Sequence, residues 1–267
     1  MKTVLLILGV LLGLYGLICL LMYRFQEALI FPAYSLPADF VFRFPFSPEP
    51  EEIWLDGDEA KLHGLYFGPK AAKGVVLYFH GNGGALDDWG EVVPRFLERD
   101  LAVLLVDYRG YGKSTGKRSE AAILEDALIA YDWVAARWQS DQIRIYGRSL
   151  GSGIATYVAA KRPAKSLLIE TPYAQLSQVA QDRYRWLPVL QLIRFHFPTY
   201  RYLEEVEAPV FLIHGTADQV IPVHHSHRLK GAFPQSTYVE IQGGNHNNLD
   251  QYPTYYSWLD IALLRQD

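Results

Sequence analysis

From residue 51 onward, short apolar runs alternate with segments of helical periodicity, a pattern typical of α/β proteins. The first two runs alternate apolar and polar residues on either side of Asp56-Gly57-Asp58, which predicts an antiparallel hairpin. The later runs are mostly continuous apolar residues, as in parallel strands that are buried on both faces. The predicted strands cover residues 51–55, 62–67, 75–79, 102–106, 143–146, 167–169, 210–213 and 238–241.

Helical patterns fill most of the intervals between these runs. They lie near residues 86–98, 119–138, 150–161, 224–232 and 250–265. In the second pattern, four apolar side chains recur on one face at helical spacing: Ile123, Ala127, Ala130 and Val134. The sequence therefore predicts one α/β domain over residues 51–267, with helices on both faces of an open sheet. A segment at about 172–202 interrupts the alternation and is predicted to be an insertion.

The amino-terminal segment is predicted to be a membrane anchor over residues 1–24. Residues 3–23 contain no charged side chain, with Lys2 before them and Arg24 after them. As a helix they would span about 31 Å, close to the thickness of the hydrocarbon core of a bilayer. A cleavable signal peptide and a buried core helix are the alternatives. The apolar run continues through Met22 and no Ala-x-Ala pattern follows, which favours an uncleaved anchor.

The charges beside this segment bear on its orientation. The amino terminus and Lys2 place two positive charges before the span, whereas Arg24 after it is offset by Glu27. The positive-inside rule then predicts a cytoplasmic amino terminus and the remaining chain on the non-cytoplasmic side of the membrane.

Residues 25–50 form a connector rich in proline and phenylalanine, and no helix is expected there. Four residues near its start are open to two interpretations, because they would suit the lipid interface as well as packing on the domain: Phe25, Leu29, Phe31 and Tyr34.

Composition excludes several classes of function. The net charge is −4 and the sequence pI is about 6.1, so no basic surface for nucleic acid is expected. Cys19 is the single cysteine, which rules out an intrachain disulfide and a cysteine-based zinc site.

Two motifs that resemble ligand sites are interpreted as structural. His224, His225 and His227 have no carboxylate at ligand spacing, so they are expected to begin a solvated helix and no metal is predicted. Residues 107–114 (DYRGYGKS) lack the first glycine of a P-loop, so no nucleotide is predicted. We expect a turn there in which Asp107 and Arg109 are paired or hydrogen-bonded.

Gly147-Arg148-Ser149-Leu150-Gly151 lies between a predicted strand and a predicted helix. Gly-x-Ser-x-Gly in this context is the nucleophile elbow, in which the turn is too tight for bulky neighbours. It predicts Ser149 as a nucleophile at the carboxyl edge of the sheet. Arg148 contacts either substrate or solvent, and the sequence does not separate the two.

A serine nucleophile needs a base that is oriented by an acid. Asp218 follows the strand at 210–213 and His246 follows the last strand, so both are expected at the same edge of the sheet as Ser149. Glu170, at the end of the preceding strand, is the alternative acid. His80 and His214 are expected to be buried residues that shape their loops rather than bases.

The glycine-rich segment His80-Gly81-Asn82-Gly83-Gly84 also follows a strand. Its backbone can direct the Asn82 N–H toward an oxyanion, together with the Leu150 N–H at the start of the next helix. These two groups are the predicted oxyanion hole.

Several of these segments resemble the α/β-hydrolase superfamily. They are YFHGNGG (78–84), VDYRGYGKSTG (106–116), YGRSLGSG (146–153), IHGTADQVIP (213–222) and GGNH (243–246). The chain is most similar to the membrane-anchored serine hydrolases of that superfamily, with prolyl-oligopeptidase-like and protein-depalmitoylating relatives. The resemblance covers about residues 25–265. It implies an α/β-hydrolase fold with a mostly parallel eight-stranded sheet and a short helical cap at 172–202. It also implies a Ser149–Asp218–His246 triad.

The sequence thus predicts a membrane-tethered serine hydrolase that needs no cofactor. The expected substrate is an ester or thioester of a small or lipid-like acyl group, because the anchor and the cap are both apolar. A peptidase of prolyl-oligopeptidase-like type is the second hypothesis. A non-catalytic binding module with the same fold is the third. The oligomeric state is not predicted.

Overall fold

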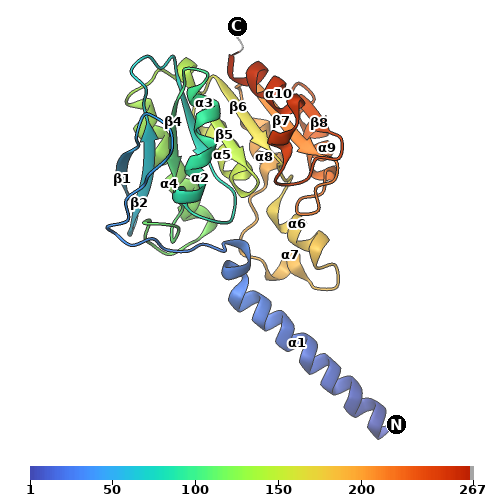
Figure 1. The fold of residues 1–267 in the computed structure, drawn as a ribbon. Helices are drawn as coiled ribbons and strands as arrows, with labels where there is room; N and C mark the ends of the chain where they lie inside the picture. The colour runs from blue at the N-terminus through green and yellow to red at the C-terminus, as the bar shows by residue number, and fades with distance from the viewer. Residues whose placement is uncertain (265–267) are drawn as a thin grey trace.

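An eight-stranded sheet forms the centre of the molecule (Figure 1). The computed structural model describes residues 1–264. The strands lie in the order β1-β2-β4-β3-β5-β6-β7-β8; β1 to β2 and β2 to β4 are antiparallel, and the other neighbours are parallel. Their bounds are β1 Glu51–Gly57, β2 Ala60–Phe67, β3 Val75–Phe79, β4 Ala102–Val106, β5 Ile143–Arg148, β6 Ser166–Glu170, β7 Val210–Gly215 and β8 Thr237–Ile241. The predicted mostly parallel sheet is confirmed.

Helices cover both faces of this sheet, as predicted. One core lies between the sheet and α4 (Glu120–Ala135), α5 (Leu150–Lys161) and α9 (His224–Ala232). The other lies between the sheet and α2 (Leu86–Trp89), α3 (Pro94–Leu97) and α10 (Pro253–Leu264). Along β3, alternate side chains enter opposite cores, which explains why this central strand has no charged residue. Short 3-10 helices lie at η1 Gly90–Val92, η2 Ser140–Gln142, η3 Leu203–Glu205 and η4 Leu249–Gln251.

The helix expected near residues 86–98 is instead three short pieces, α2, η1 and α3. Pro94 has no N–H to bond within a continuous helix, so it begins a new one. Gly90 lies under the ring of Phe44, and a Cβ at position 90 would come within 2.1 Å of that ring. The break therefore accommodates the connector on the surface of the domain.

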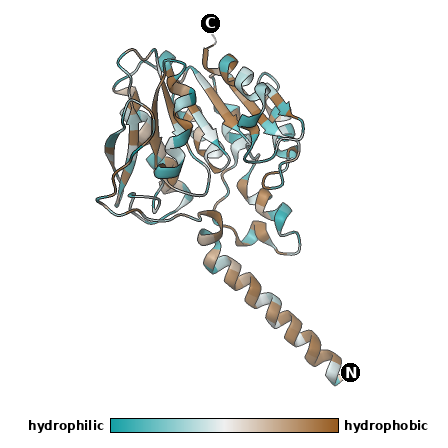
Figure 2. Cartoon of the chain, viewed as in Figure 1, coloured by the Kyte–Doolittle hydropathy of each residue, from teal (hydrophilic) through white to brown (hydrophobic). Residues whose placement is uncertain are grey.

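The amino-terminal helix, α1 (Lys2–Ile30), extends away from the body of the molecule (Figure 1). It runs six residues beyond the predicted anchor bound at residue 24, so the expectation of no helix in the connector was wrong for residues 25–30. The proline-rich part begins only at Pro32, where the helix has ended. Apolar residues predominate along α1 (Figure 2), and the helix is long and apolar enough to be a candidate transmembrane span.

The connector packs against the sheet domain. Main-chain hydrogen bonds join Leu36 N to Gly112 O at 2.8 Å and Gly112 N to Tyr34 O at 2.9 Å. Phe31 is buried and packs edge-on against Phe195, with ring centroids 4.8 Å apart. Phe25 and Leu29 are exposed, and the Tyr34 hydroxyl bonds to Asp87 and Asp88. Of the four residues with two interpretations, Phe31 and Tyr34 thus contact the domain.

The insertion between β6 and β7 forms the cap, with helices α6 (Leu176–Arg183), α7 (Val189–Leu192) and α8 (Thr199–Tyr202). Helices α6 and α7 lie beside the carboxyl-terminal end of α1 (Figure 1). The buried amide of Gln26 donates to Leu192 O at 3.1 Å and accepts from Arg194 N at 2.7 Å. Arg194 also pairs with Glu27 at 2.8 Å. The amino-terminal helix and the cap are therefore joined directly.

Candidate active site

The turn between β5 and α5 holds Ser149 in a conformation that L residues rarely adopt, with φ of +52°. Such a conformation costs on the order of 1–3 kcal/mol and persists only where the surroundings enforce it. The flanking glycines show what enforces it. A Cβ at Gly147 would lie 2.3 Å from Gly151 O, and a Cβ at Gly151 would lie 2.1 Å from Phe79 O. Only glycine fits at these two positions, as the nucleophile-elbow motif predicts.

The structure brings Ser149, His246 and Asp218 together at the carboxyl edge of the sheet. His246 Nε2 lies 2.9 Å from Ser149 Oγ, and His246 Nδ1 lies 2.7 Å from Asp218 Oδ2. Ser149 follows β5, Asp218 follows β7 and His246 follows β8, so adjacent parts of one sheet supply all three. The arrangement is a continuous hydrogen-bonded chain from carboxylate to hydroxyl.

Asp218 is held as an ionised carboxylate. Its side chain is buried, and burial alone would raise its pKa. Hydrogen bonds from His214 and His246, with the backbone N–H of Ile221 at 2.9 Å, outweigh burial and lower the pKa of Asp218 well below its usual range. A carboxylate without a proton can only accept hydrogen bonds. His246 Nδ1 therefore carries a proton, which leaves Nε2 free to accept one from Ser149.

His214 is a second histidine on the Asp218 carboxylate. Its Nε2 lies 3.1 Å from Asp218 Oδ2 and 2.9 Å from Ile221 O, and its Nδ1 lies 2.6 Å from Ser226 Oγ. The ring is fully buried, and its hydrogen bonds go to Asp218, Ile221 and Ser226. This agrees with the predicted loop-shaping role, and it adds a support for Asp218 that the sequence does not reveal.

Glu170, the alternative acid, lies elsewhere in the hydrogen-bond network. Its carboxylate accepts from the Tyr146 hydroxyl at 2.5 Å and lies 3.2 Å from Arg148 Nε. Arg148 in turn donates to the main-chain oxygen of His246 at 3.1 Å. The structure therefore joins Asp218, not Glu170, to the imidazole. Arg148, for which the sequence left contact with substrate and contact with solvent open, is mostly buried. It links the elbow to the loop that carries His246.

The predicted oxyanion residues Asn82 and Leu150 both lie beside Ser149. They line the same pocket, of about 490 Å³. Two tyrosine hydroxyls fix the glycine-rich loop by bonding to its carbonyls, Tyr108 to His80 O and Tyr111 to Asn82 O, both at 2.7 Å. The segment at 107–114 therefore holds the glycine-rich loop in place.

The pocket extends from Ser149 toward the cap and the end of α1. Its remaining lining comes from Leu29, Ile30, Tyr173, Leu176, Val179, Ala180, Arg183, Tyr184, Ile193, Gln219, Val220 and Ile221. Most of these side chains are apolar. Leu29 and Ile30 were missed as pocket residues by the sequence interpretation, since only the tertiary fold brings the amino-terminal helix to the sheet edge.

The segment at 107–114 pairs differently from the prediction. Arg109 bonds Asp126 of α4 through both Nε and Nη2, at 2.6 and 2.9 Å. Asp107 faces His80 instead, with Nε2 and Oδ1 3.5 Å apart. The expected Asp107–Arg109 pair is wrong, because the turn directs the two side chains toward different neighbours. His80 is buried, as predicted.

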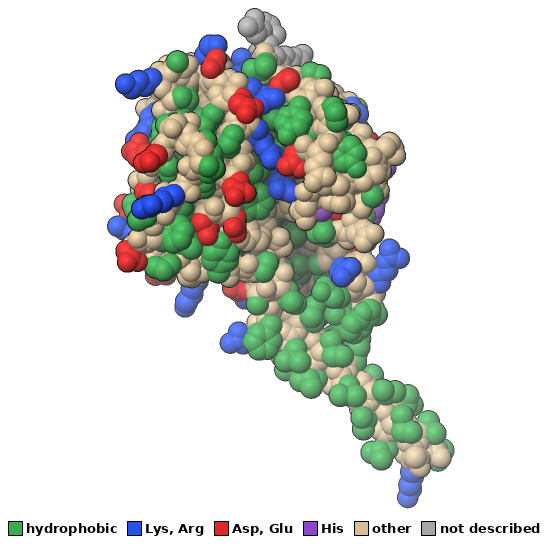
Figure 3. All heavy atoms as spheres, viewed as in Figure 1, with side chains coloured by type: hydrophobic (Ala, Val, Ile, Leu, Met, Phe, Trp, Pro, Cys, Tyr) green, Lys and Arg blue, Asp and Glu red, His purple; other side chains and the backbone are tan. Residues whose placement is uncertain are grey.

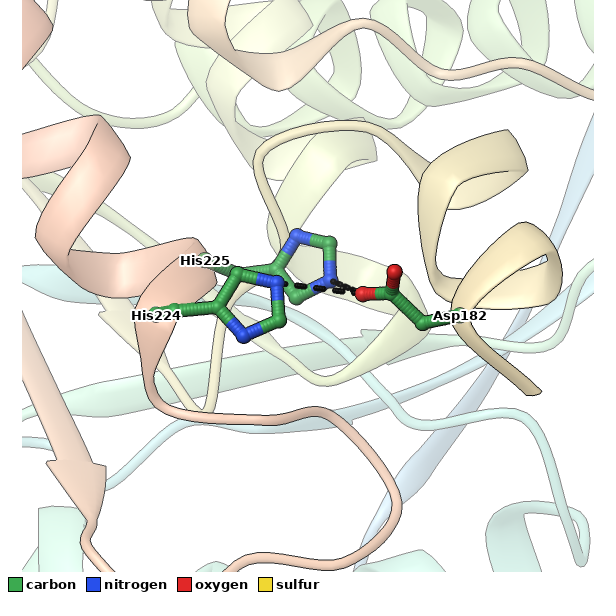
Figure 4. Close-up of side chains that lie close together, drawn as sticks. All are labelled: Asp182, His224 and His225. Atoms are coloured by element: carbon green, nitrogen blue, oxygen red, sulfur yellow. Dashed lines mark hydrogen bonds and ion pairs between the residues drawn. The ribbon is translucent and has the colours of Figure 1, made fainter. Parts of the chain in front are cut away.

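Beside the cap, the structure groups His224, His225 and Asp182, whose ligand atoms lie within 4.8 Å of one another (Figure 4). Asp182 Oδ2 lies 3.0 Å from His224 Nε2 and 3.2 Å from His225 Nε2. The sequence interpretation found no such carboxylate, because Asp182 comes from the distant cap. The expected solvated helix start is only partly right, since His225 is buried.

The tautomer of His225 argues against a metal at this cluster. Its Nδ1 accepts from the backbone N–H of Ala174 at 3.3 Å, so its Nε2 carries the proton and donates to Asp182. A metal on Nε2 would require that nitrogen to be unprotonated. The cluster is best explained as a contact between the cap and α9.

Comparison with known proteins agrees with the fold. Residues 70–202 match a family model described as serine aminopeptidase, S33, and residues 165–253 match one described as alpha/beta hydrolase fold. The chain belongs to the α/β-hydrolase superfamily. It is 35% identical over 197 residues to an uncharacterized protein of Mycobacterium tuberculosis, covering 72% of this chain and 70% of that protein.

Two relatives have named activities. The lysophosphatidylserine lipase ABHD12 of Mus musculus is 28% identical over 199 residues, which are 67% of this chain and 48% of the lipase. This chain therefore aligns with about half of that lipase. An esterase from Pyrococcus furiosus has the same fold, with a TM-score of 0.68 at 19% identity over 88% of this chain and 98% of the esterase. The family model and the lipase support a hydrolase, and the esterase shows the same fold.

Proposed function

We propose that the protein is a membrane-tethered serine hydrolase that cleaves carboxylic ester or thioester bonds through a covalent acyl-enzyme. The observation that carries the proposal is the hydrogen-bonded chain from Asp218 through His246 to Ser149, with distances of 2.7 and 2.9 Å. A hydroxyl, an imidazole and an ionised carboxylate in this order have the geometry of nucleophilic acyl transfer.

In the proposed mechanism, Ser149 Oγ attacks the substrate carbonyl while His246 Nε2 takes its proton. Asp218 stabilises the imidazolium that forms. The backbone N–H groups of Asn82 and Leu150 receive the developing oxyanion. His246 then gives the proton to the leaving group, and in the second half-reaction it activates water against the acyl-enzyme. These steps need only residues of this chain.

Two features support an ester or thioester with an apolar acyl group. The pocket at Ser149 is lined mostly by apolar side chains, and the candidate transmembrane helix contributes Leu29 and Ile30 to its wall. The ABHD12 relatives are named as lipases of a lysophospholipid. Among the described residues that line this pocket, Arg183 is the only charged side chain, which suits a substrate with a nearby negative group.

The membrane part of the proposal rests on α1, and its orientation rests on charge alone. We propose that α1 crosses the bilayer with the amino terminus in the cytoplasm and the hydrolase domain on the opposite side. Residues 51–267 would then be the catalytic domain, with the cap at about 172–202 and the connector over 25–50.

A serine peptidase is the second candidate, because residues 70–202 match the model described as serine aminopeptidase. The test is a fluorophosphonate probe on the full-length protein in detergent, followed by p-nitrophenyl esters and short peptide amides. We expect labelling that is lost in Ser149→Ala, with turnover of the esters above that of the peptides. Equal labelling of the parent and Ser149→Ala would contradict the proposal. Faster peptide turnover would favour the peptidase, and a folded sample with no turnover at all would favour a binding module.

A further inference from the structure

A narrow apolar crevice separates the end of α1 from the cap. It is about 60 Å³ in volume, and Met22 on α1 and Leu192 on α7 line its far end. Its near end shares five lining residues with the pocket at Ser149: Leu29, Ile30, Ala180, Tyr184 and Ile193. The crevice and the pocket are therefore adjacent and have a common wall.

The walls of this crevice offer little to a polar ligand. Gln26 is its one amide, and both polar atoms of that amide are already bonded. Nε2 donates to Tyr23 O at 2.9 Å and to Leu192 O at 3.1 Å, while Oε1 accepts from Arg194 N. An alkyl chain suits such a surface, because it needs no hydrogen bonds and its transfer out of water lowers the free energy.

Part of the cap lies alongside the apolar segment of α1. The Tyr15 hydroxyl donates to Trp186 O at 3.0 Å, and Tyr15 lies within the uncharged run of residues 3–23. Trp186 and Leu190 at the tip of the cap are 58% and 47% exposed, which is unusual for large apolar side chains on a surface in water. Hydrophobic side chains cover α1 and continue onto the adjoining part of the body (Figure 3).

These placements constrain where the crevice lies in the membrane. If residues 3–23 cross the bilayer, Trp186 lies at the depth of Tyr15, inside the apolar layer. Met22 is seven residues further along α1, or about 10 Å nearer the surface. The far end of the crevice is then at the edge of the layer of lipid chains, and Ser149 lies beyond its near end.

We propose that the crevice between α1 and the cap is an acyl-chain site. It takes one chain of a single-chain lipid directly from the bilayer and leads the ester to Ser149. This rests on the proposed function of Ser149. The occupant is one alkyl chain rather than two, because a crevice of about 60 Å³ has no room for a second chain. The anchor thus has a second role as one wall of the substrate site.

Full-length protein in phosphatidylcholine vesicles tests this proposal with two substrates, p-nitrophenyl palmitate in the bilayer and p-nitrophenyl butyrate in water. Met22→Trp fills the far end of the crevice. We expect it to lower the ratio of palmitate to butyrate turnover by about tenfold or more, since bulk in an apolar pocket has effects of this size. Leu21→Trp is the matched control, because Leu21 directly precedes Met22 on α1, is exposed and does not line the crevice. It should keep the ratio of the parent.

Leu192→Trp repeats the test from the cap wall, with the exposed neighbour Gln191→Trp as its control. Labelling of Ser149 by a small fluorophosphonate shows that each variant is folded. If Met22→Trp and Leu192→Trp both keep the parent's ratio of palmitate to butyrate turnover, the crevice is not an acyl-chain site. The proposed hydrolase activity of Ser149 would not be affected by that result. A parent protein with no labelling and no butyrate turnover would contradict the proposed function, and the route with it.

Discussion

The candidate active site and the cap are held together in different ways. At Ser149, Asp218 and His246, partly buried hydrogen bonds of 2.7 and 2.9 Å join residues that follow three parallel strands. The backbone also leaves no space for a side chain at Gly147 or Gly151. The cap instead touches α1 through a few bonds to Gln26 and Tyr15 and through apolar contacts, with large side chains still exposed. The rigid sheet edge thus suits the proposed chemistry, which needs fixed distances. The cap and α1 suit the proposed selection of the substrate, which tolerates movement.

The strongest test of the sheet edge is Asp218→Asn compared with Glu170→Gln. An amide at 218 can donate to His246 and favour the wrong tautomer, so kcat/KM should fall by about 10⁴-fold with little change in the fold. Glu170→Gln should chiefly reduce stability, by about 3 kcal/mol or more, because Arg148 would lose a buried partner. Ester hydrolysis and thermal unfolding of both variants separate the two roles. A larger kinetic loss in Glu170→Gln would reverse the assignment of the acid.

The packing of the elbow predicts a large effect of a single methyl group. Gly151→Ala would place a Cβ 2.1 Å from Phe79 O, and the strain should destabilise the domain by about 3 kcal/mol. Gly231→Ala is the matched control in α9, where a Cβ meets nothing within 4 Å. It should stabilise the protein by about 0.5–1 kcal/mol. Denaturant unfolding of both variants in detergent measures the difference, and equal stabilities would mean that the elbow is not closely packed.

The junction between the cap and α1 should be weaker. Gln26→Ala removes the amide that serves Leu192 O and Arg194 N, so the local stability of α7 should fall by about 1–2 kcal/mol. Hydrogen exchange of residues 189–194 would show this as faster exchange there, with the central strands unchanged. Glu27→Gln breaks only the exposed ion pair with Arg194 and should have an effect below about 1 kcal/mol. Unaltered exchange in Gln26→Ala would mean that the stability of the cap does not depend on its contact with α1.

The contact between the cap and α9 predicts a dependence on pH. Burial, with His224 beside it, lowers the pKa of His225 below its usual value despite the neighbouring Asp182. The folded protein then binds fewer protons than the unfolded chain, so this residue makes stability fall as the pH drops below about 6.5.

Replacing His225 by Gln should remove that contribution and reduce the pH slope of stability by up to about 1.4 kcal/mol per pH unit. Unfolding between pH 5 and pH 7 measures the slope. His227→Gln is the control on the same helix, since His227 is exposed and pairs with Glu240 outside the cap. Identical slopes for the parent and His225→Gln would contradict a neutral buried His225.

The sequence by itself determined the sheet and predicted the residues at its edge. Strands buried on both faces must be apolar throughout, and a turn without space must have glycines, so both features are visible as local patterns. Ser149, Asp218 and His246 each lie within five residues of the end of a strand, and parallel strands end at the same edge. That is why residues far apart in the chain were predicted to meet before the structure showed their distances.

Only the tertiary structure decided which side chains form pairs and which line the same pocket. Asp182 meets His224 and His225, Arg109 selects Asp126 over Asp107, and Leu29 joins the pocket at Ser149. None of these contacts has a fixed spacing along the chain, because each depends on how a cap or a terminal helix packs against a distant element. Backbone periodicity follows from local geometry, whereas these pairings follow from the free energy of packing the whole chain.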